Sequence, residues 1–259
     1  MRPLVSALTL GIISAMSSST TAEDKKPDGR VYEMRVYYAN PGKLDALHAR
    51  FKNHTMKFFE KHGIANVGYF VPVGENKDEK LVYFLSYPSK EAADKSWKAL
   101  FADEEVKKAF AETEKDGRLV KKVVSKYLTP TDYSPALKVD TKGDRAFELR
   151  TYTATKGNLP GLDARFKDHT LKLFEKHGMS NLIYWHLIAS DKDADKMLIY
   201  LLSHKSPEAA KASFDAFRLD ADWLAARKAS EEKAGGSLTE AKDGVLSEFL
   251  KPTDYSPWK

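Results

Sequence analysis

The sequence contains no cysteine in its 259 residues. Disulfide bonds, thiolate metal sites, a cysteine nucleophile and a lipid anchor on cysteine are therefore excluded, while the redox compartment stays open. The sequence also lacks a Walker A loop, a Rossmann glycine fingerprint, an HExxH zinc motif and a GxSxG nucleophile motif. None of its histidines forms a duplicated metal-ligand pattern, so we expect neither a metal nor a cofactor.

A strong charge of one sign is missing as well. The formal net charge is +5, from 42 basic and 37 acidic residues. The lysines alternate with acidic residues on predicted helix faces, for example at Glu91, Asp94, Lys95 and Lys98, which is typical of a solvated surface. A nucleic-acid-binding protein more often gathers its basic residues on one stripe. We therefore expect no nucleic-acid partner.

Only one long apolar run is present, Leu4–Met16. Arg2 precedes it, a small polar stretch follows, and Ala22 stands before the charged residues 23–26. This order is typical of a secretory signal peptide, and the run is too short for a membrane span, which needs about 20 residues. We expect cleavage after residue 22 and export to the periplasm or the medium, with no stable membrane span afterwards. An uncleaved N-terminal anchor is the alternative, and a mitochondrial presequence is less favoured because the segment is poor in arginine.

The dominant feature of the chain is a tandem repeat. Residues 49–70 return at 164–185 with a spacing of 115, which later grows to 117 and reaches 122 where PTDYSP (130–135) recurs at 252–257. Insertions of this kind settle in loops. The sequence therefore predicts a signal peptide, a flexible segment, a first domain, a linker and a second domain, at 1–22, 23–30, 31–135, 136–145 and 146–259.

Each copy reads strand, helix, strand, strand, helix, strand. In the first copy, alternation and spacings of three and four predict strands at 32–38, 65–73, 80–87 and 119–128, and helices at 44–62, 90–101 and 103–114. Gly63 suits a left-handed helix end, and Ser89 suits an N-cap. This α+β order is that of the split βαβ, or ferredoxin-like, unit, whose sheet has helices on one face. We expect the two sheets to cover each other as a pseudo-two-fold α/β barrel within one chain.

Each copy resembles a NIPSNAP domain. The resemblance rests on five features, which are an opening E-x-R-x-Y, a following Gly turn, an F-E-K-H-G helix end, an N-x-x-Y after it and a terminal P-T-x-Y-S. It covers nearly all of 31–135 and 146–257. It implies a ferredoxin-like dimeric α/β-barrel fold and no established enzymatic activity. The mitochondrial and membrane-traffic roles of animal members are not carried over, because the N-terminus reads as a secretory signal.

The first strand of each copy carries a Glu–Arg–Tyr triad on one face. Period two places Glu33, Arg35 and Tyr37 together, and the second copy repeats them as Glu148, Arg150 and Tyr152. We expect the apolar face to receive the helices and the triads to face the space between the sheets. There they would hold a small anionic or aromatic ligand, or would form a self-satisfied polar network that locks the sheets together.

Further candidates lie on the first helix and the second strand of each copy. His54 and His169 follow Phe51 and Phe166 by three residues, and each is either a general base or haem ligand in a cavity or a packed core histidine. On the strand, alternation cannot say which residue of each neighbouring aromatic pair faces the helices and which faces the inter-sheet space. These pairs are Tyr69–Phe70 and Tyr184–Trp185.

Three functions remain open from the sequence. The first is an exported protein that binds a small ligand or a partner through the cleft between two ferredoxin-like sheets, with oligomers possible. The second, by analogy of fold, is an enzyme of the cofactor-poor oxygenase, isomerase or haem-modifying kind, with Arg35, Tyr37, His54 and their second-copy counterparts as the active groups. The third is a structural interaction module with a fully packed cleft.

Overall fold

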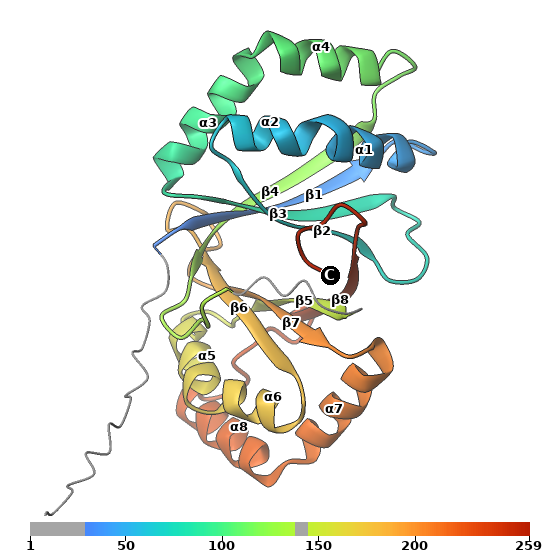
Figure 1. Ribbon diagram of the computed structural model, residues 1–259. Coiled ribbons are helices and arrows are strands. Elements are labelled where there is room, and N and C mark those ends of the chain that lie inside the picture. Colours follow the sequence, from blue (N-terminus) through green and yellow to red (C-terminus); the bar gives the residue numbers. More distant parts are fainter. Residues whose placement is uncertain (1–28, 138–144) are drawn as a thin grey trace, which may run out of the picture.

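The computed structural model describes residues 29–137 and 145–259. They form a closed, wholly antiparallel barrel of eight strands with helices on two opposite outer sides (Figure 1). The predicted signal peptide, nearly all of the predicted flexible segment and most of the predicted linker lie outside the described residues.

The first half follows the predicted order of elements. Gly63 is left-handed, with φ of 74°, and the Ser89 side chain accepts a hydrogen bond from the Ala92 amide at 3.2 Å, as the sequence predicts. The predicted first helix runs through a π-helical turn at Phe51–Thr55. The other elements are β1 (Val31–Ala39), α1 (Leu44–Arg50), α2 (Met56–Lys61), β2 (Ala65–Pro72), β3 (Lys80–Tyr87), α3 (Lys90–Ala102), α4 (Glu104–Thr113) and β4 (Val120–Pro130).

The second half repeats this order, including a π-helical turn at Phe166–Thr170. Its last helix is longer than α4, at 14 residues against 10, and ends at the left-handed Gly235. The elements are β5 (Ala146–Thr153), α5 (Leu159–Arg165), α6 (Leu171–Lys176), β6 (Ser180–Leu187), β7 (Met197–His204), α7 (Pro207–Leu219), α8 (Ala221–Ala234) and β8 (Val245–Pro252).

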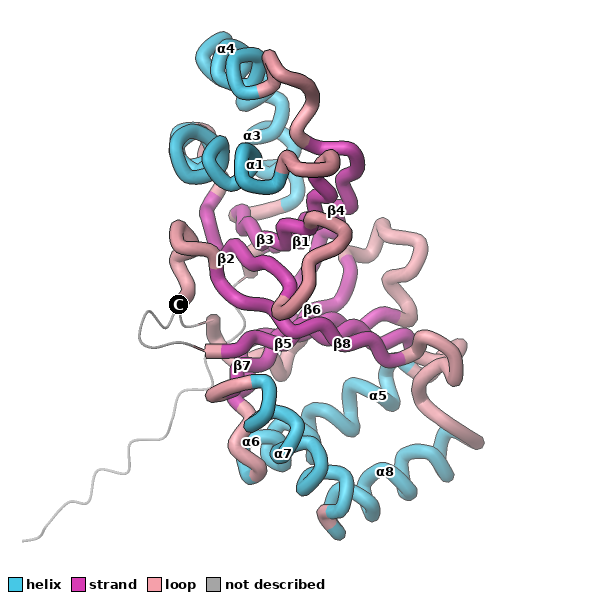
Figure 2. Tube along the Cα trace, turned by 90° about the vertical axis from the view of Figure 1, so that its right-hand side faces the viewer, coloured by secondary structure: helices cyan, strands magenta, loops and turns pink. Residues whose placement is uncertain are grey.

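The barrel consists of two four-stranded sheets joined at both edges. The strand order is β4-β1-β3-β2 in one half and β6-β7-β5-β8 in the other, and the junctions are β2 with β8 and β4 with β6. Figures 1 and 2 show the two sheets lying against each other, with the helices on the outside. The expected barrel within one chain is confirmed.

The space between the sheets is an apolar core. Trp185 from the second half lies 5.3 Å from Phe84 and 5.6 Å from Tyr32 of the first, measured between ring centroids. Phe70 lies 5.1 Å from Phe147 across the same space. The sequence left an open and a packed cleft between the sheets as alternatives, and the structure supports the packed one, because buried apolar side chains from both halves meet there.

The repeated PTDYSP segments fasten each half to the other. The Ser134 hydroxyl accepts a hydrogen bond from the Tyr184 amide, and the Ser256 hydroxyl accepts one from the Tyr69 amide, both at 3.0 Å. Each segment thus crosses from its own last strand to the second strand of the other half. The recurrence of this motif is explained by packing between the halves.

Among the residues that the structure describes, no helix has both the length and the apolar character needed to cross a membrane.

Candidate functional site

The Glu–Arg–Tyr triads lie between each sheet and its own helices. On β1, Tyr32 and Met34 enter the barrel interior, so Glu33, Arg35 and Tyr37 point to the opposite face. The expectation that the triads face the other sheet is wrong. The physical reason is that the closed barrel offers apolar partners only, whereas the helix layer supplies the donors that a buried carboxylate requires.

In the first half the buried carboxylate is fully satisfied. Glu33 has no exposed surface and accepts hydrogen bonds from Arg35 (2.5 Å), the Tyr87 hydroxyl (2.6 Å), the Ser125 hydroxyl (2.6 Å) and the Trp97 indole (2.9 Å). Two of these donors come from strands next to β1 and one comes from α3. This polar network is self-satisfied, as one of the two sequence interpretations expected, but it joins a sheet to a helix rather than two sheets.

The Arg35 guanidinium is also fully engaged. Its Nε donates to the Tyr83 hydroxyl at 2.9 Å, and its other two nitrogens donate to Glu33 and Tyr37. Its face packs on the Trp97 ring, 4.3 Å from the centroid. Each of the three guanidinium nitrogens of Arg35 therefore has a hydrogen-bond partner.

The second half repeats the network incompletely. Glu148 accepts hydrogen bonds from Arg150 (2.5 Å), the Ser247 hydroxyl (2.5 Å) and the His204 imidazole (2.9 Å). The Arg150 Nε and the Tyr200 hydroxyl, which correspond to the bonded pair Arg35 and Tyr83, are both buried without a hydrogen-bond partner. A buried polar group without a partner costs about 1–3 kcal/mol.

A cavity lies beside this incomplete network. We call it the inner cavity, and its volume is about 240 Å³. Its walls come mainly from β5, α5, α7, α8 and the loop after α8. The lining residues include Arg150, Tyr152, Arg165, Phe214, Trp223, Arg227 and Glu231. The corresponding space in the first half measures about 20 Å³ and is lined by Tyr37, Arg50, Phe51, Trp97 and Phe110, among others. The two copies thus differ in whether the helix layer over the triad is closed.

Two substitutions between the copies remove aromatic surface from this layer. Position by position, Trp97 of α3 becomes Phe214 of α7, which loses the indole that bonds the carboxylate. Phe110 of α4, which packs on Arg50, becomes Arg227 of α8, whose side chain is 56% exposed. An aromatic plug is thereby replaced by a charged side chain at the rim of the cavity.

The inner cavity carries an unbalanced positive charge. In the first half, Arg50 forms its own ion pair with Glu114 at 2.8 Å. In the second half, Arg165 and Arg227 share Glu231, at 3.7 Å and 3.0 Å. Burial lowers the pKa of the Arg165 guanidinium, and the nearby Arg227 lowers it further. Two cations with one carboxylate form a site that an anion would stabilise.

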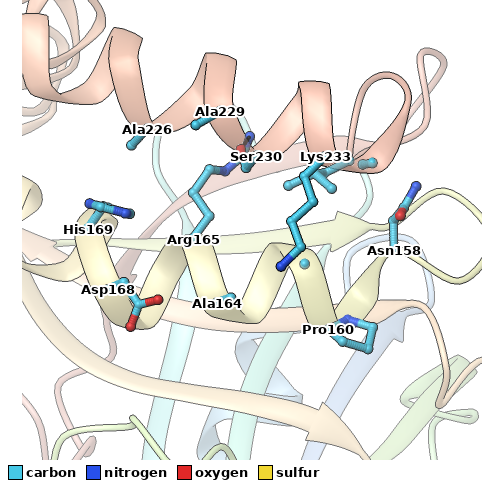
Figure 3. Close-up of a pocket in the computed structure, with 13 residues that line it drawn as sticks. Asn158, Pro160, Ala164, Arg165, Asp168, His169, Ala226, Ala229, Ser230 and Lys233 are labelled. Atoms are coloured by element: carbon cyan, nitrogen blue, oxygen red, sulfur yellow. Dashed lines mark hydrogen bonds between the residues drawn. The ribbon is translucent and has the colours of Figure 1, made fainter.

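Arg165 also borders a second, more open space, which we call the outer groove. It measures about 450 Å³ and runs between α5 and α8, along Gly161, Ala164, Ala226, Ala229, Lys233 and Leu238, among others. Figure 3 shows Arg165 reaching from α5 towards Ser230 of α8, and Lys233 reaching back from α8 towards α5. The Arg165 side chain is 6% exposed, and its Nε has no hydrogen-bond partner.

The two histidines of the π-helical turns lie outside the barrel. His54 is half-buried and stacks on Phe58 at 6.4 Å between centroids, whereas His169 is exposed at one end of the outer groove. Of the two sequence alternatives, the packed core histidine is wrong for His169. A π-helical turn is often found at functional sites, and in this half the turn places His169 one helical turn from Arg165.

The structure also decides how the aromatic pairs of the second strands point. Tyr69 and Tyr184 face the helices and are fully buried, while Phe70 and Trp185 face the barrel interior. Neither Tyr184 nor Trp185 lines the inner cavity. Of the residues singled out from the sequence, Arg150 and Tyr152 are brought together there, and His169 lies on the adjoining groove.

Comparison with known proteins identifies the family. The NIPSNAP model matches residues 32–135 and 147–257, which is most of the chain. The chain belongs to the NIPSNAP family. No curated protein matches the sequence.

Solved structures agree with the barrel fold. A proposed monooxygenase from Lactobacillus acidophilus matches with a TM-score of 0.53 at 12% identity, over 86% of this chain and 93% of its own. An anthrone oxidase-like protein matches with a TM-score of 0.54 at 13% identity, over 90% and 95%. An uncharacterised NIPSNAP-like domain protein from Burkholderia xenovorans matches at 19% identity and a TM-score of 0.38, over 43% of this chain and 93% of its own. At these identities the first two likenesses support the fold alone.

The sequence interpretation missed three residues that line the inner cavity, Arg165, Trp223 and Arg227. Arg165 is identical in the two NIPSNAP repeats, as Arg50, whereas Trp223 and Arg227 replace Val106 and Phe110 of the first repeat. Aligning the two copies for differences instead of identities would have found the change from Phe110 to Arg227. In residues 29–137 and 145–259 there is no group of three or more His, Asp or Glu side chains arranged to hold a metal ion.

Proposed function

We propose that this NIPSNAP protein binds a small anion with an aromatic or apolar body in the inner cavity of its second half. The observation that carries the proposal is the difference between two copies of one site in one chain. The first copy has a space of about 20 Å³ and one arginine paired with one glutamate. The second has about 240 Å³ and two arginines on one glutamate.

The chemistry of the walls supports a ligand of this class. Phe214, Phe217 and Trp223 supply apolar surface, and Trp223 lies 4.5 Å from Phe217 between ring centroids. Arg165 and Arg227 supply donors for an oxyanion, in the fork geometry that carboxylates prefer. A small-molecule site combines mostly apolar walls with a few convergent polar groups in this way.

We propose that each half is a ferredoxin-like unit, which its element order and its sheet order of β4-β1-β3-β2 support.

We also propose export after cleavage near residue 22, which the charge and hydropathy order of the N-terminus supports. N-terminal sequencing of protein purified from its host tests export, and an intact Met1 on the mature protein would contradict it.

Benzoate is a suitable probe of the inner cavity, because it joins one carboxylate to one ring. We expect calorimetric titration of the whole protein with benzoate to give one site per chain, with an affinity that falls as salt is added. The Arg227→Phe variant copies the residue of the first half, so it should close the cavity and weaken benzoate binding at least tenfold. Its circular dichroism spectrum should stay unchanged.

Lys228→Phe is the matched control for this experiment. Lys228 is the next residue on α8, is 77% exposed and does not line the inner cavity. The control removes the same charge and adds the same ring, so benzoate affinity should stay within about twofold of the parent. Equal losses in the two variants, or no binding by the parent, would refute the proposed site.

A further inference from the structure

The outer groove and the inner cavity adjoin each other at Arg165, which lines both spaces. Resting on the proposed function, we infer that the two spaces form one bipartite site for an amphipathic carboxylate. Its head binds Arg165 at the inner cavity, and its slender hydrocarbon tail lies along the groove between α5 and α8.

The shape of the groove argues for a slender tail. Its walls carry Gly161, Ala164, Ala226 and Ala229, which project a methyl group or nothing into the space. The stretch of α8 that lines it runs from Ala226 to Ala234, which is about 12 Å at 1.5 Å per residue. Polar side chains, among them Asp168 and Lys233, also border the groove. A trough of that length with small residues on both helices can hold an extended hydrocarbon chain.

The loose attachment of Arg165 argues for a shared wall that can open. Arg50, its counterpart, is fixed by a 2.8 Å ion pair and by packing 4.6 Å from the centroid of Phe110. Arg165 has a 3.7 Å approach to Glu231, a 3.4 Å contact with the Ser230 hydroxyl and a distance of 5.2 Å from the Trp223 ring. Its buried Nε has no acceptor, a property that it shares with the Nε of Arg50. A carboxylate would supply that acceptor together with the missing negative charge.

The packing of α8 is consistent with an occupant. Ala226 is its only buried residue, whereas the shorter α4 buries the larger Val106. The inner cavity lies along Trp223, Arg227 and Glu231 of α8, and the outer groove lies along the neighbouring face that contains Ala226 and Ala229. A helix with space on two sides can move outward by a small amount at little cost in buried contacts.

Calorimetric titration of the full chain with dodecanoate, butanoate, dodecanol and benzoate tests the inference. Dodecanoate should bind at least tenfold more tightly than butanoate, because its tail leaves water. It should also bind at least tenfold more tightly than dodecanol, which has no negative charge. Ala229→Leu places a larger side chain in the groove at an exposed helix position, so it should weaken dodecanoate at least tenfold and leave benzoate within twofold.

Ala111→Leu is the matched control, because Ala111 of α4 is an exposed helical alanine, like Ala229, and lines neither space. It should change neither affinity. Two results would overturn the bipartite site and leave the proposed function standing. In the first, benzoate binds but dodecanoate binds no more tightly than butanoate. In the second, Ala229→Leu leaves dodecanoate affinity unchanged. Equal affinities for dodecanoate and dodecanol would also overturn it, as non-specific partition. Failure of both dodecanoate and benzoate to bind would refute the proposed function itself.

Discussion

Arg165 of α5 and Arg227 of α8 share a single carboxylate, Glu231, at 3.7 Å and 3.0 Å. In the first half the corresponding residues are Arg50 and Phe110, and the arginine has Glu114 to itself. The change from Phe110 to Arg227 therefore removes a packed aromatic ring and adds a cation at the same position of the duplicated unit. The first half therefore serves as an internal reference for the second.

The two buried arginines should differ in their effect on stability. Arg50→Met leaves Glu114 without its partner, and we expect the free energy of unfolding to fall by about 2 kcal/mol, since Glu114 is partly exposed and its charge is partly solvated. Arg165→Met leaves Glu231 paired with Arg227, so the loss should be below about 1 kcal/mol. Urea unfolding of both variants measures this, and a larger loss for Arg165→Met would contradict the shared pair.

Exchanging the residue types of Trp97 and Phe214 should weaken the polar network of the first half and narrow the inner cavity of the second. Trp97→Phe removes the indole donor to the buried Glu33, and we expect a loss of about 2 kcal/mol, typical of a hydrogen bond to a charged group. Phe214→Trp should instead fill part of the inner cavity and weaken benzoate at least tenfold. Unfolding curves and calorimetry on the two variants provide the measurements. Benzoate affinity unchanged in Phe214→Trp would argue against the inner cavity as the binding site.

The buried Glu148 predicts an acid-sensitive second half. Burial would raise the pKa of this carboxyl, but hydrogen bonds from His204, Ser247 and Arg150, with the charge of Arg150, outweigh it and lower the pKa overall. A depressed folded pKa contributes stability above the unfolded value of about 4.3, and this contribution is lost as the pH falls through the folded value.

We therefore expect the unfolding free energy of the parent to fall below about pH 4.3. Glu148→Gln cannot take up this proton, so its stability should be lower at neutral pH and should change less steeply in acid. Urea unfolding at pH values from three to seven measures both slopes. Parallel slopes for parent and variant would mean that Glu148 does not titrate in this range.

The two PTDYSP serines should stabilise the junction between the halves. Ser134→Ala and Ser256→Ala each leave a buried backbone amide, of Tyr184 or Tyr69, without its acceptor. We expect each change to cost about 1–2 kcal/mol and the double variant to cost nearly the sum, since the two sites lie at different junctions. Thermal unfolding measures this, and Ser190→Ala, at an exposed position, is the control.

The repeat made most of the fold predictable from the sequence. Alternation fixed the strands, spacings of three and four fixed the helices, and Gly63 and Ser89 marked their ends, because these signals depend on neighbours along the chain. A half-buried sheet repeated once also predicted that two sheets would cover each other. The family followed from motifs that occur twice, at matching places in both copies.

The orientation of the triads was decided only by the tertiary structure. Period two tells which residues share a face but not where that face points, and Glu33 had acceptable partners on either side until the closed barrel filled its interior with Trp185, Phe84 and Tyr32. The open second site was hidden for a similar reason. Its defining feature, Arg227 beside Arg165, joins residues 62 positions apart in the sequence, and their shared Glu231 becomes significant only when α8 lies against α5.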